Sequence, residues 1–403
     1  MKRGRRKCIF FVDTCKQKRN WLYRDYMRKS LVLHLKTHQW SKKMKFCQLI
    51  GVLSLGAFLL VGCDGENITT VSEKESNIPL SGRVGPVSQY GELLAGAVDG
   101  VGHIYGSCEG VAAGKEVQLR GMSMFWSVAD VGADFYNETT INNLVKDLKI
   151  EVIRLAIGTE ENWGVGGFLV DPDAQRKMIK ESVMAAVKND IYVIIDWHSH
   201  TATDQLEGAT QFFEEMAQEY GGFNNVIFEL FNEPISQKWD DIRAYANQLV
   251  ATIRKYSDNL IVVGNPTYSQ TPNSAIGKEV EDPKHNVAYT MHYYAMTHSN
   301  WVMNNTEKAM KAGLPVFVTE WGTVEASGDG ASGEAENQRW QEFMDKNLLS
   351  SANWSVSNKD EGASLFTPNS TPESYELTTS GKMVKEILSK NPNSYTACKV
   401  AKK

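Results

Sequence analysis

The feature that most constrains the fold is a regular alternation of short β-type runs with helical patterns. Strands that alternate with helices favour parallel βαβ units, in which both faces of the sheet are covered. Eight such runs occur in the second part of the chain: Val117–Met122, Glu151–Ala156, Ile191–Trp197, Val226–Phe231, Leu260–Gly264, Val287–Tyr293, Pro315–Trp321 and Ala352–Val356.

Helical periodicity fills most of the intervals between these runs, and the interval between the fifth and sixth runs is poorly helical. The expected helices are Thr139–Leu148, Ala174–Lys188, Gln211–Tyr220, Ile242–Tyr256, Thr306–Ala312, Asn337–Leu348 and a closing helix at Lys382–Leu388. Eight units in about 300 residues predict an α/β fold of the (β/α)₈ or TIM-barrel type. A doubly wound sheet is the alternative, but it would favour a glycine-rich phosphate turn after the first strand, and Arg120–Ser123 is not one.

Charge is unevenly distributed along the chain. Residues 1–62 carry fifteen Lys/Arg and two Asp/Glu, which leaves 43 − 15 = 28 basic and 48 − 2 = 46 acidic residues, a net charge of −18, for residues 63–403. An acidic body argues against nucleic acid as a partner, whereas a neutral polysaccharide remains compatible with it. We expect a monomer.

The basic N-terminal region has the features of an export signal. Lysines at 42, 43 and 45 precede the apolar run Leu49–Val61, which has the length of a signal h-region. The run ends in Leu60–Cys63, which resembles the lipobox of bacterial lipoproteins, in which the cysteine is lipidated. An ordinary signal or a short anchor helix is the alternative. We therefore expect a basic extension and signal over 1–62, with the signal proper at 44–62 and Met44 as a candidate start.

The rest of the chain divides into a tether and a catalytic domain. Residues 63–82 are polar and predict a flexible tether, and residues 83–403 predict a single catalytic barrel on the exported, lipid-anchored protein. With Cys63 acylated, Cys108 and Cys398 are the cysteines left in the mature body, and in an oxidising compartment they predict a disulfide. Two separate thiols remain the alternative. No Cys/His cluster has zinc spacing, so we expect neither a metal nor a cofactor.

Titratable and aromatic residues follow the ends of several predicted strands. In a (β/α)₈ barrel the active site lies at the carboxyl ends of the strands, so these side chains should meet at one face. They are Arg154, Asp196, His198, His200, Asn232, Glu233, His292, Tyr294, His298, Glu320 and Trp354.

Glu233 and Glu320 carry the most chemical information. Each follows an apolar run, so each carboxylate should enter the barrel mouth. Two carboxylates on either side of a glycosidic bond suit retaining hydrolysis, in which one protonates the leaving oxygen and the other attacks the anomeric carbon. Two carboxylates that flank the same bond lie close together, and their like charges oppose ionisation of both. We therefore expect one glutamate to be held protonated and to act as the acid. A salt bridge or helix cap is the alternative for either residue alone.

Together with the motifs around them, these residues resemble glycoside hydrolase family 5, in particular its bacterial endoglucanase branch. The resemblance runs from about Gly85 to Leu388. Its motifs are Arg120–Ser123, Asp196–His198, Asn232–Pro234, Met291–Tyr294, Thr319–Gly322 and Ala352–Ser355.

The resemblance implies roles for individual residues. Glu233 would be the acid/base, and Glu320 the nucleophile, kept ionised and oriented by Arg154. Asn232 would bind the sugar 2-hydroxyl, and His198, His292 and Tyr294 would complete a polar ring. Trp354 would be an aromatic sugar platform, and Lys359 and Glu361 resemble residues that hold the sugar on the non-reducing side.

In one place the chain departs from the family pattern. Close relatives often carry a further aromatic residue or histidine after the first strand, where this chain has Ser127–Asp130. One distal sugar contact is therefore expected to be weaker. Trp126, Trp321 and Tyr268 are lesser candidates for sugar platforms, each with packing as the alternative role.

We therefore expect a retaining endo-β-1,4-glucanase that acts on cellulose or related β-glucans. One alternative is the same machinery acting on mannan, xyloglucan or mixed-linkage glucan. Another is a non-catalytic carbohydrate-binding lipoprotein, against which the presence of Glu233, Glu320, Asn232 and Arg154 argues.

Overall fold

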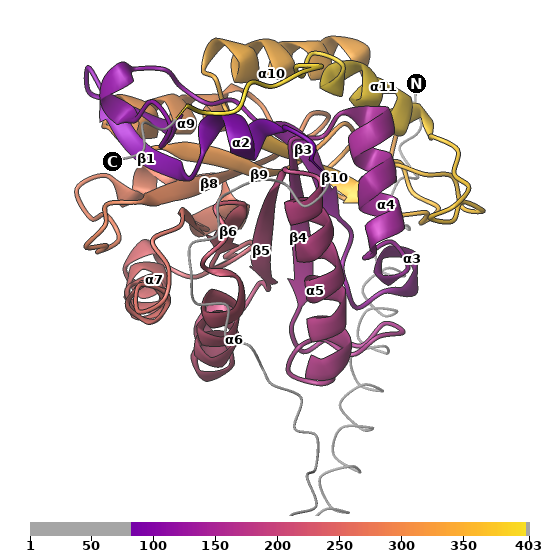
Figure 1. The fold of residues 1–403 in the computed structure, drawn as a ribbon, viewed down its shortest axis with the longest axis horizontal. Coiled ribbons are helices and arrows are strands. Elements are labelled where there is room, and N and C mark those ends of the chain that lie inside the picture. The colour runs from indigo at the N-terminus through magenta and orange to yellow at the C-terminus, as the bar shows by residue number, and fades with distance from the viewer. Residues whose placement is uncertain (1–81, 400–403) are drawn as a thin grey trace, which may run out of the picture. The chain divides into compact units, whose positions relative to one another are not determined.

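The computed structural model describes residues 82–399 as a closed barrel of eight parallel strands (Figure 1). The expected signal at 44–62, the lipidation site Cys63 and all but the last residue of the tether lie outside the described residues. The barrel order is β10-β3-β4-β5-β6-β7-β8-β9, and the fold is the predicted (β/α)₈ barrel. Its strands are β3 (Arg120–Met124), β4 (Val152–Gly158), β5 (Tyr192–His198), β6 (Val226–Glu229), β7 (Ile261–Val263), β8 (Val287–Tyr294), β9 (Val316–Gly322) and β10 (Ser351–Val356).

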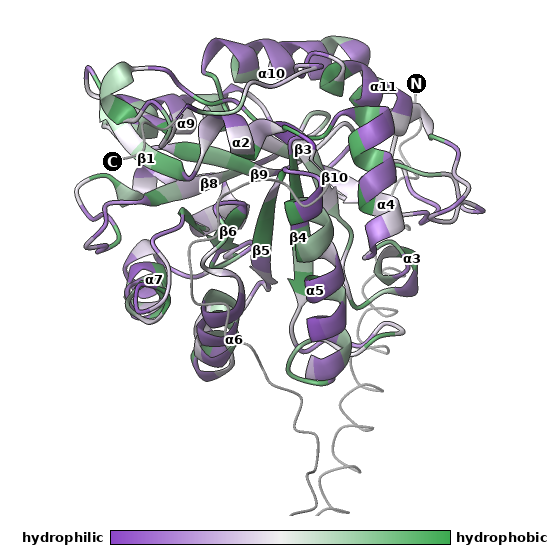
Figure 2. Cartoon of the chain, viewed as in Figure 1, coloured by the Kyte–Doolittle hydropathy of each residue, from purple (hydrophilic) through white to green (hydrophobic). Residues whose placement is uncertain are grey.

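Helices cover the outside of the barrel, and Figure 2 shows apolar strands enclosed by helices with polar outer faces. The helices are α2 (Pro86–Tyr90), α3 (Asp130–Ala133), α4 (Glu138–Asn143), α5 (Pro172–Lys188), α6 (Leu206–Tyr220), α7 (Trp239–Ile253), α8 (Pro266–Ser269), α9 (Asn300–Lys311), α10 (Glu334–Lys346) and α11 (Thr379–Leu388). Between β7 and β8 there are only short turns, α8 and Pro272–Ala275, as the weak periodicity there predicts. Among the described residues, no helix is both long enough and apolar enough to cross a membrane.

The interior of the barrel is built in two layers. Strand side chains near the amino ends form an apolar layer that includes Val152, Ile194, Ile227, Ala288 and Phe317. Because side chains alternate between the two faces of a strand, the residue two positions further along each strand points the same way. Those residues are all polar and completely buried: Arg154, Asp196, Glu229, Thr290 and Thr319. The alternation of these five strands thus places a polar layer directly above an apolar one.

A two-stranded antiparallel hairpin closes the amino-terminal end of the barrel. It consists of β1 (Leu93–Val98) and β2 (Val101–Gly106), and its Leu93 and Ile104 pack into the apolar layer. Sequence analysis did not find it, because its strands are short and contain glycine and alanine in place of most of the large β-branched residues that mark the barrel strands.

The two ends of the described chain meet at this same closed end. Cys108 and Cys398 are joined by a disulfide, with Cα atoms 5.9 Å apart. Close by, the Cys398 N–H donates to the Ser88 carbonyl at 2.7 Å. The closing helix α11 and the segment before β3 are therefore tied together on the face opposite the carboxyl ends of the strands.

Candidate active site

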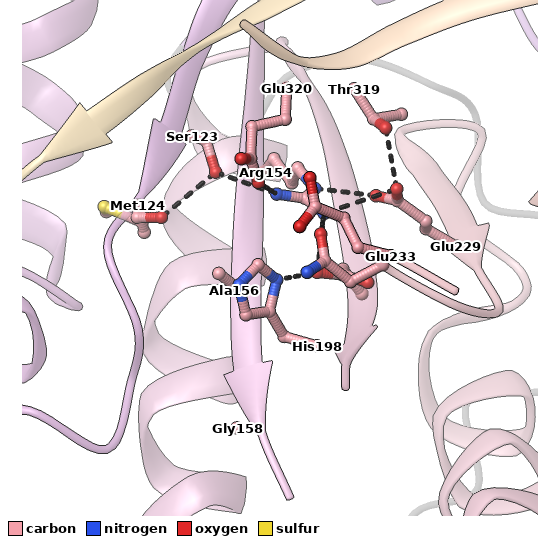
Figure 3. A network of polar contacts seen from close by, with 12 residues as sticks. Ser123, Met124, Arg154, Ala156, Gly158, His198, Glu229, Glu233, Thr319 and Glu320 are labelled. Carbon is pink, nitrogen blue, oxygen red and sulfur yellow. Dashed lines mark hydrogen bonds and ion pairs between the residues drawn. The ribbon is translucent and has the colours of Figure 1, made fainter. Parts of the chain in front are cut away.

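Arg154, on β4, organises the polar layer, and its side chain is fully buried (Figure 3). Its Nε and Nη2 donate to Glu229 at 2.7 and 3.3 Å, and its Nη1 donates to Glu320 at 3.0 Å. Nη2 also donates to Asn232 Oδ1 at 2.7 Å and lies 2.9 Å from Asp196 Oδ2. Burial lowers the pKa of Arg154, but the charges of its three carboxylate partners outweigh burial and raise that pKa above its ordinary value. Arg154 is therefore a fixed cation beneath the site.

Glu320 lies on β9, and both of its carboxylate oxygens are held. The Tyr294 hydroxyl donates to Oε1 at 2.8 Å, and Arg154 donates to Oε2. Only 6% of the Glu320 side chain is exposed. Two donors from different strands therefore fix the plane of this carboxylate before any substrate binds.

Glu233 lies four residues beyond the end of β6, in a turn and not on the predicted strand end. His292 Nδ1 lies 3.0 Å from Glu233 Oε1, and His200 Nε2 lies 3.3 Å from Oε2. His292 is itself oriented, because its Nε2 lies 2.9 Å from Thr319 Oγ1 and the Thr319 hydroxyl donates to Glu229. The acid candidate is thus linked to the polar layer through His292.

A strained segment after β7 supports the turn that carries Glu233. The Ser269 hydroxyl donates to the Asn232 carbonyl at 2.7 Å, and the Tyr268 N–H donates to the Pro234 carbonyl at 2.9 Å. Residues 267–269 all have φ between 56° and 62°, in the left-handed region that side chains rarely adopt. Such strain is maintained only where surrounding contacts enforce it.

Asn232 presents its amide group to the site in one orientation. Arg154 can only donate hydrogen bonds, so the Asn232 oxygen faces Arg154 and its NH₂ group faces away. This leaves a donor beside the two glutamates.

The pKa directions of the glutamates differ from those expected from the sequence. Burial raises the pKa of Glu233, but hydrogen bonds and charge from His200 and His292 outweigh it and lower that pKa to about 2. Burial and the charge of Glu233 raise the pKa of Glu320, and His292, Arg154 and Tyr294 offset this only in part. The sequence analysis expected the acid to be held protonated and Glu320 to be kept ionised, and the resemblance makes Glu233 the acid. The two pKa shifts run the other way, because the sequence does not reveal that two imidazoles flank Glu233.

His198 belongs to the buried part of the site. Its Nδ1 lies 2.6 Å from Asp196 Oδ2, and burial lowers the pKa of His198 well below its ordinary value. Burial likewise raises the pKa of Asp196 well above its ordinary value, and the nearby Glu229 contributes in the same direction. A neutral imidazole therefore faces the site at ordinary pH.

The two glutamates face each other closely. One carboxylate oxygen of Glu233, one of Glu320 and a nitrogen of His292 all lie within 4.8 Å of one another. Among the described residues, these are the groups close enough to share a metal ion. Arg154 already supplies a positive charge 3.0 Å from Glu320, which disfavours a second cation there.

The candidate sugar platforms differ in how far they are exposed. Trp354 stacks on His198 with ring centroids 5.4 Å apart and planes 5° apart, and 5% of its surface is exposed. Trp321 is 1% exposed and stacks on Tyr293, so its role is packing. Tyr268, by contrast, is 41% exposed.

Lys359 and Glu361 lie together, in the segment after β10. They form an ion pair, and Lys359 Nζ lies 5.2 Å from the centroid of the Phe125 ring, which itself contacts Trp354. Burial raises the pKa of Glu361. Lys359 thus lies beside the ring that contacts Trp354, and Glu361 is paired with it.

Sequence analysis gave no role to two members of this network, Glu229 and Thr319. Glu229 is fully buried and accepts from both Arg154 and Thr319. The alternation of side chains along a strand could have identified Glu229. It lies two residues after Ile227, as Arg154 lies two residues after Val152, so both pairs point to the same face. A carboxylate that follows an apolar run within a strand is thus expected to face the barrel interior.

The fold and the site together define a (β/α)₈ protein with paired, oriented glutamates at the carboxyl ends of its strands. The chain belongs to the cellulase family, glycosyl hydrolase family 5, whose model matches residues 111–360.

Two curated relatives are bacterial endoglucanases. Endoglucanase Z of Dickeya dadantii is 41% identical over 284 residues, which are 70% of this chain and 65% of the relative. Endoglucanase A of Evansella cellulosilytica is 39% identical over 289 residues, 68% of this chain and 57% of the relative. The match thus spans less than two thirds of the length of either relative.

Solved structures agree with the fold. A protein from Cytophaga hutchinsonii is similar with a TM-score of 0.69 and 38% identity, over 76% of this chain and 96% of that chain. The catalytic domain of an endoglucanase from Thermobifida fusca, solved in complex with cellotetraose, has a TM-score of 0.68 and 27% identity, over 76% of this chain and 100% of that chain.

Proposed function

We propose that this protein is a retaining endo-β-1,4-glucanase, with Glu320 as the nucleophile and Glu233 as the acid/base. The observation that carries the proposal is the approach of the two carboxylates, whose oxygens lie within 4.8 Å of each other. Retaining enzymes place their carboxyl groups about 5 Å apart, whereas inverting enzymes leave roughly 6.5–9.5 Å for a water molecule. Family membership and the endoglucanase relatives support the choice of a β-glucan as substrate.

The reaction then proceeds in two displacements. A Glu320 oxygen attacks the anomeric carbon while Glu233 gives its proton to the leaving glycosidic oxygen. Water, deprotonated by Glu233, then attacks the same carbon and releases Glu320. The hydrogen bonds from Arg154 and Tyr294 orient Glu320 for the first attack, and the NH₂ group of Asn232 is available to the sugar 2-hydroxyl.

The proton for the acid step comes from the cluster around Glu233. His292 and His200 both lie within hydrogen-bonding distance of its oxygens. The proton of such a pair lies on the imidazole or on the carboxyl group, and a bound leaving oxygen that displaces His200 would raise the pKa of Glu233.

The test is substitution of each glutamate by its isosteric amide. Glu233→Gln and Glu320→Gln should each lower turnover of cello-oligosaccharides by several orders of magnitude while the thermal midpoint stays near that of the wild type. Aryl cellobiosides with good leaving groups should rescue Glu233→Gln but not Glu320→Gln. The exposed Glu342→Gln serves as the matched control. Near-native turnover of unactivated cello-oligosaccharides by either variant would contradict the role given to that residue.

An NMR time course of hydrolysis tests the stereochemistry separately. The β-anomer should appear first at the new reducing end, and first appearance of the α-anomer would exclude double displacement. A panel of cellulose, mannan, xyloglucan and mixed-linkage glucan identifies the preferred glycan.

We further propose that the protein is exported and anchored to the cell envelope by a lipid on Cys63. The lysines and apolar run before Cys63 support this proposal. Metabolic fatty-acid labelling should mark the wild type and not Cys63→Ser, and Cys63→Ser should leave the membrane fraction. An unlabelled wild type would contradict the anchor.

A further inference from the structure

Trp163, in the loop between β4 and α5, is an exposed tryptophan close to the candidate site. Its side chain is 54% exposed, although a large apolar ring is normally covered. Sequence analysis did not single it out, because the loop around it has no regular pattern. What the ring does therefore has to be inferred from its surroundings.

The backbone of Trp163 is fixed against the segment after β3. The Trp163 and Val165 N–H groups both donate to the Val128 carbonyl at 3.1 Å. Gly164 allows this close approach, since its φ is +125° and a Cβ there would lie 2.3 Å from a carboxylate oxygen of Asp130. The exposed ring is thus held on an anchored loop.

A row of rings connects Trp163 to the acid/base candidate. The Trp163 ring centroid lies 5.1 Å from that of Trp126, and Trp126 lies 5.9 Å from the ring of His200. His200 in turn lies within hydrogen-bonding distance of Glu233. Trp126 also meets His198 edge-on, with centroids 4.1 Å apart. Trp163 is therefore the outer end of an aromatic surface that begins at the reacting groups.

A flat apolar ring exposed along such a surface suits one class of ligand. Pyranose rings with equatorial hydroxyls present apolar C–H faces, which pack against aromatic side chains while the hydroxyls stay in water. We propose that Trp163, supported by Trp126, binds a glucosyl unit remote from the cleaved bond. The proposal rests on the proposed β-glucanase function and assigns it a distal subsite. Trp163 would also take the place of the aromatic residue or histidine that close relatives often carry at 127–130. The backbone of Ala129 forms a β-bridge with that of Trp163, so the two positions are adjacent.

The experiment compares long and short substrates on one enzyme preparation. For Trp163→Ala, the ratio of kcat/KM on cellohexaose to kcat/KM on an aryl cellobioside should fall about tenfold, mainly through KM. Trp163→Phe keeps a ring and should recover most of this ratio. Tyr256→Ala is the matched control, because Tyr256 is 42% exposed and follows α7 at the opposite end of the barrel. It should leave the ratio unchanged.

The possible outcomes separate the two proposals. An unchanged ratio in Trp163→Ala, in a preparation that cleaves both substrates, would overturn the distal subsite alone. An equal loss on both substrates would also overturn it and would assign Trp163 a structural role. A wild type that cleaves no β-glucan would overturn the proposed function, and the subsite with it.

Discussion

In the proposed mechanism, the position of one proton near Glu233 decides whether the glutamate pair is ready to react. Glu233 faces His200 and His292 on one side and Glu320 on the other. His292 is buried and tied to Thr319, whereas the His200 side chain is 38% exposed and reaches Glu233 from the loop after β5. His200 is thus the residue through which the pKa of the acid can be altered with least damage to the fold.

We predict that His200→Gln shifts the acid limb of the pH–activity profile to higher pH. The hydrogen bond to Glu233 is the largest contribution that raises the pKa of His200, and the same bond lowers the pKa of Glu233. Removing the imidazole raises the pKa of Glu233, which is the lower pKa of the pair, so the limb on the acid side moves to higher pH. The pH dependence of kcat/KM measures the shift. The apparent pKa values of its two limbs describe Glu233 and Glu320 as a coupled pair.

The control for this prediction is His103→Gln. His103 lies on β2 at the closed end of the barrel, so its substitution should leave the profile unchanged. If the acid limb of His200→Gln stays in place or moves to lower pH, His200 does not set the pKa of Glu233.

At the scale of elements, strand alternation explains why the site is rigid. Five of the barrel strands, β4, β5, β6, β8 and β9, contribute an apolar side chain to one layer and, two residues later, a polar one to the next. Arg154 and Glu229 therefore sit on a packed floor that includes Val152 and Ile227, and none of the four can move without disturbing the others. The strands position the chemistry, while the loops carry the residues that meet the substrate.

This division also explains what the sequence could predict. All eight barrel strands and the order of the main helices follow from periodicity, as does the gathering of Glu233, Glu320 and Arg154 at one end. The distances between strands do not follow, because they depend on how the barrel closes. The contact between His200 and Glu233 depends on these distances. Because the sequence does not reveal this contact, the expected pKa directions of the glutamates were reversed. Trp163 was missed for a similar reason, since only tertiary structure reveals which loop residue is exposed beside the site.

Gly121, on β3, is the element-scale position where a small change should have a large effect. A Cβ at Gly121 would lie 1.8 Å from the Val152 carbonyl oxygen of the neighbouring strand. We predict that Gly121→Ala separates β3 from β4 and lowers the free energy of unfolding by about 3 kcal/mol. Urea denaturation measures this change. Gly222→Ala is the control, because nothing lies within 4 Å of its Cβ position, and equal midpoints for the two variants would contradict the prediction.

At the scale of the whole molecule, the Cys108–Cys398 disulfide links residues 290 positions apart. A cross-link across so long a segment restricts the unfolded chain strongly, by about 5 kcal/mol in the chain-entropy model. We predict that Cys108→Ser with Cys398→Ser, or reduction, lowers the thermal midpoint by several degrees. Turnover at moderate temperature should be nearly unchanged, because the bond lies at the end of the barrel opposite the glutamates.

Thiol titration of the unfolded domain checks the bond itself. Without reductant the described chain should yield no free thiol, and two free thiols would refute the disulfide. A large fall in turnover at moderate temperature would show that the closed end of the barrel communicates with the site.

The meeting of both ends of residues 82–399 at the closed end of the barrel has a practical consequence. A support, a fusion partner or a surface attached through either end of residues 82–399 would hold the barrel by its base. The carboxyl ends of the strands, where Glu233 and Glu320 lie, would then face outward, toward an insoluble polymer of the kind proposed as substrate, which cannot diffuse to the enzyme. Immobilisation through either end is thus expected to preserve access to solid substrate, whereas attachment through the loops that carry Trp163 or Glu233 would block it.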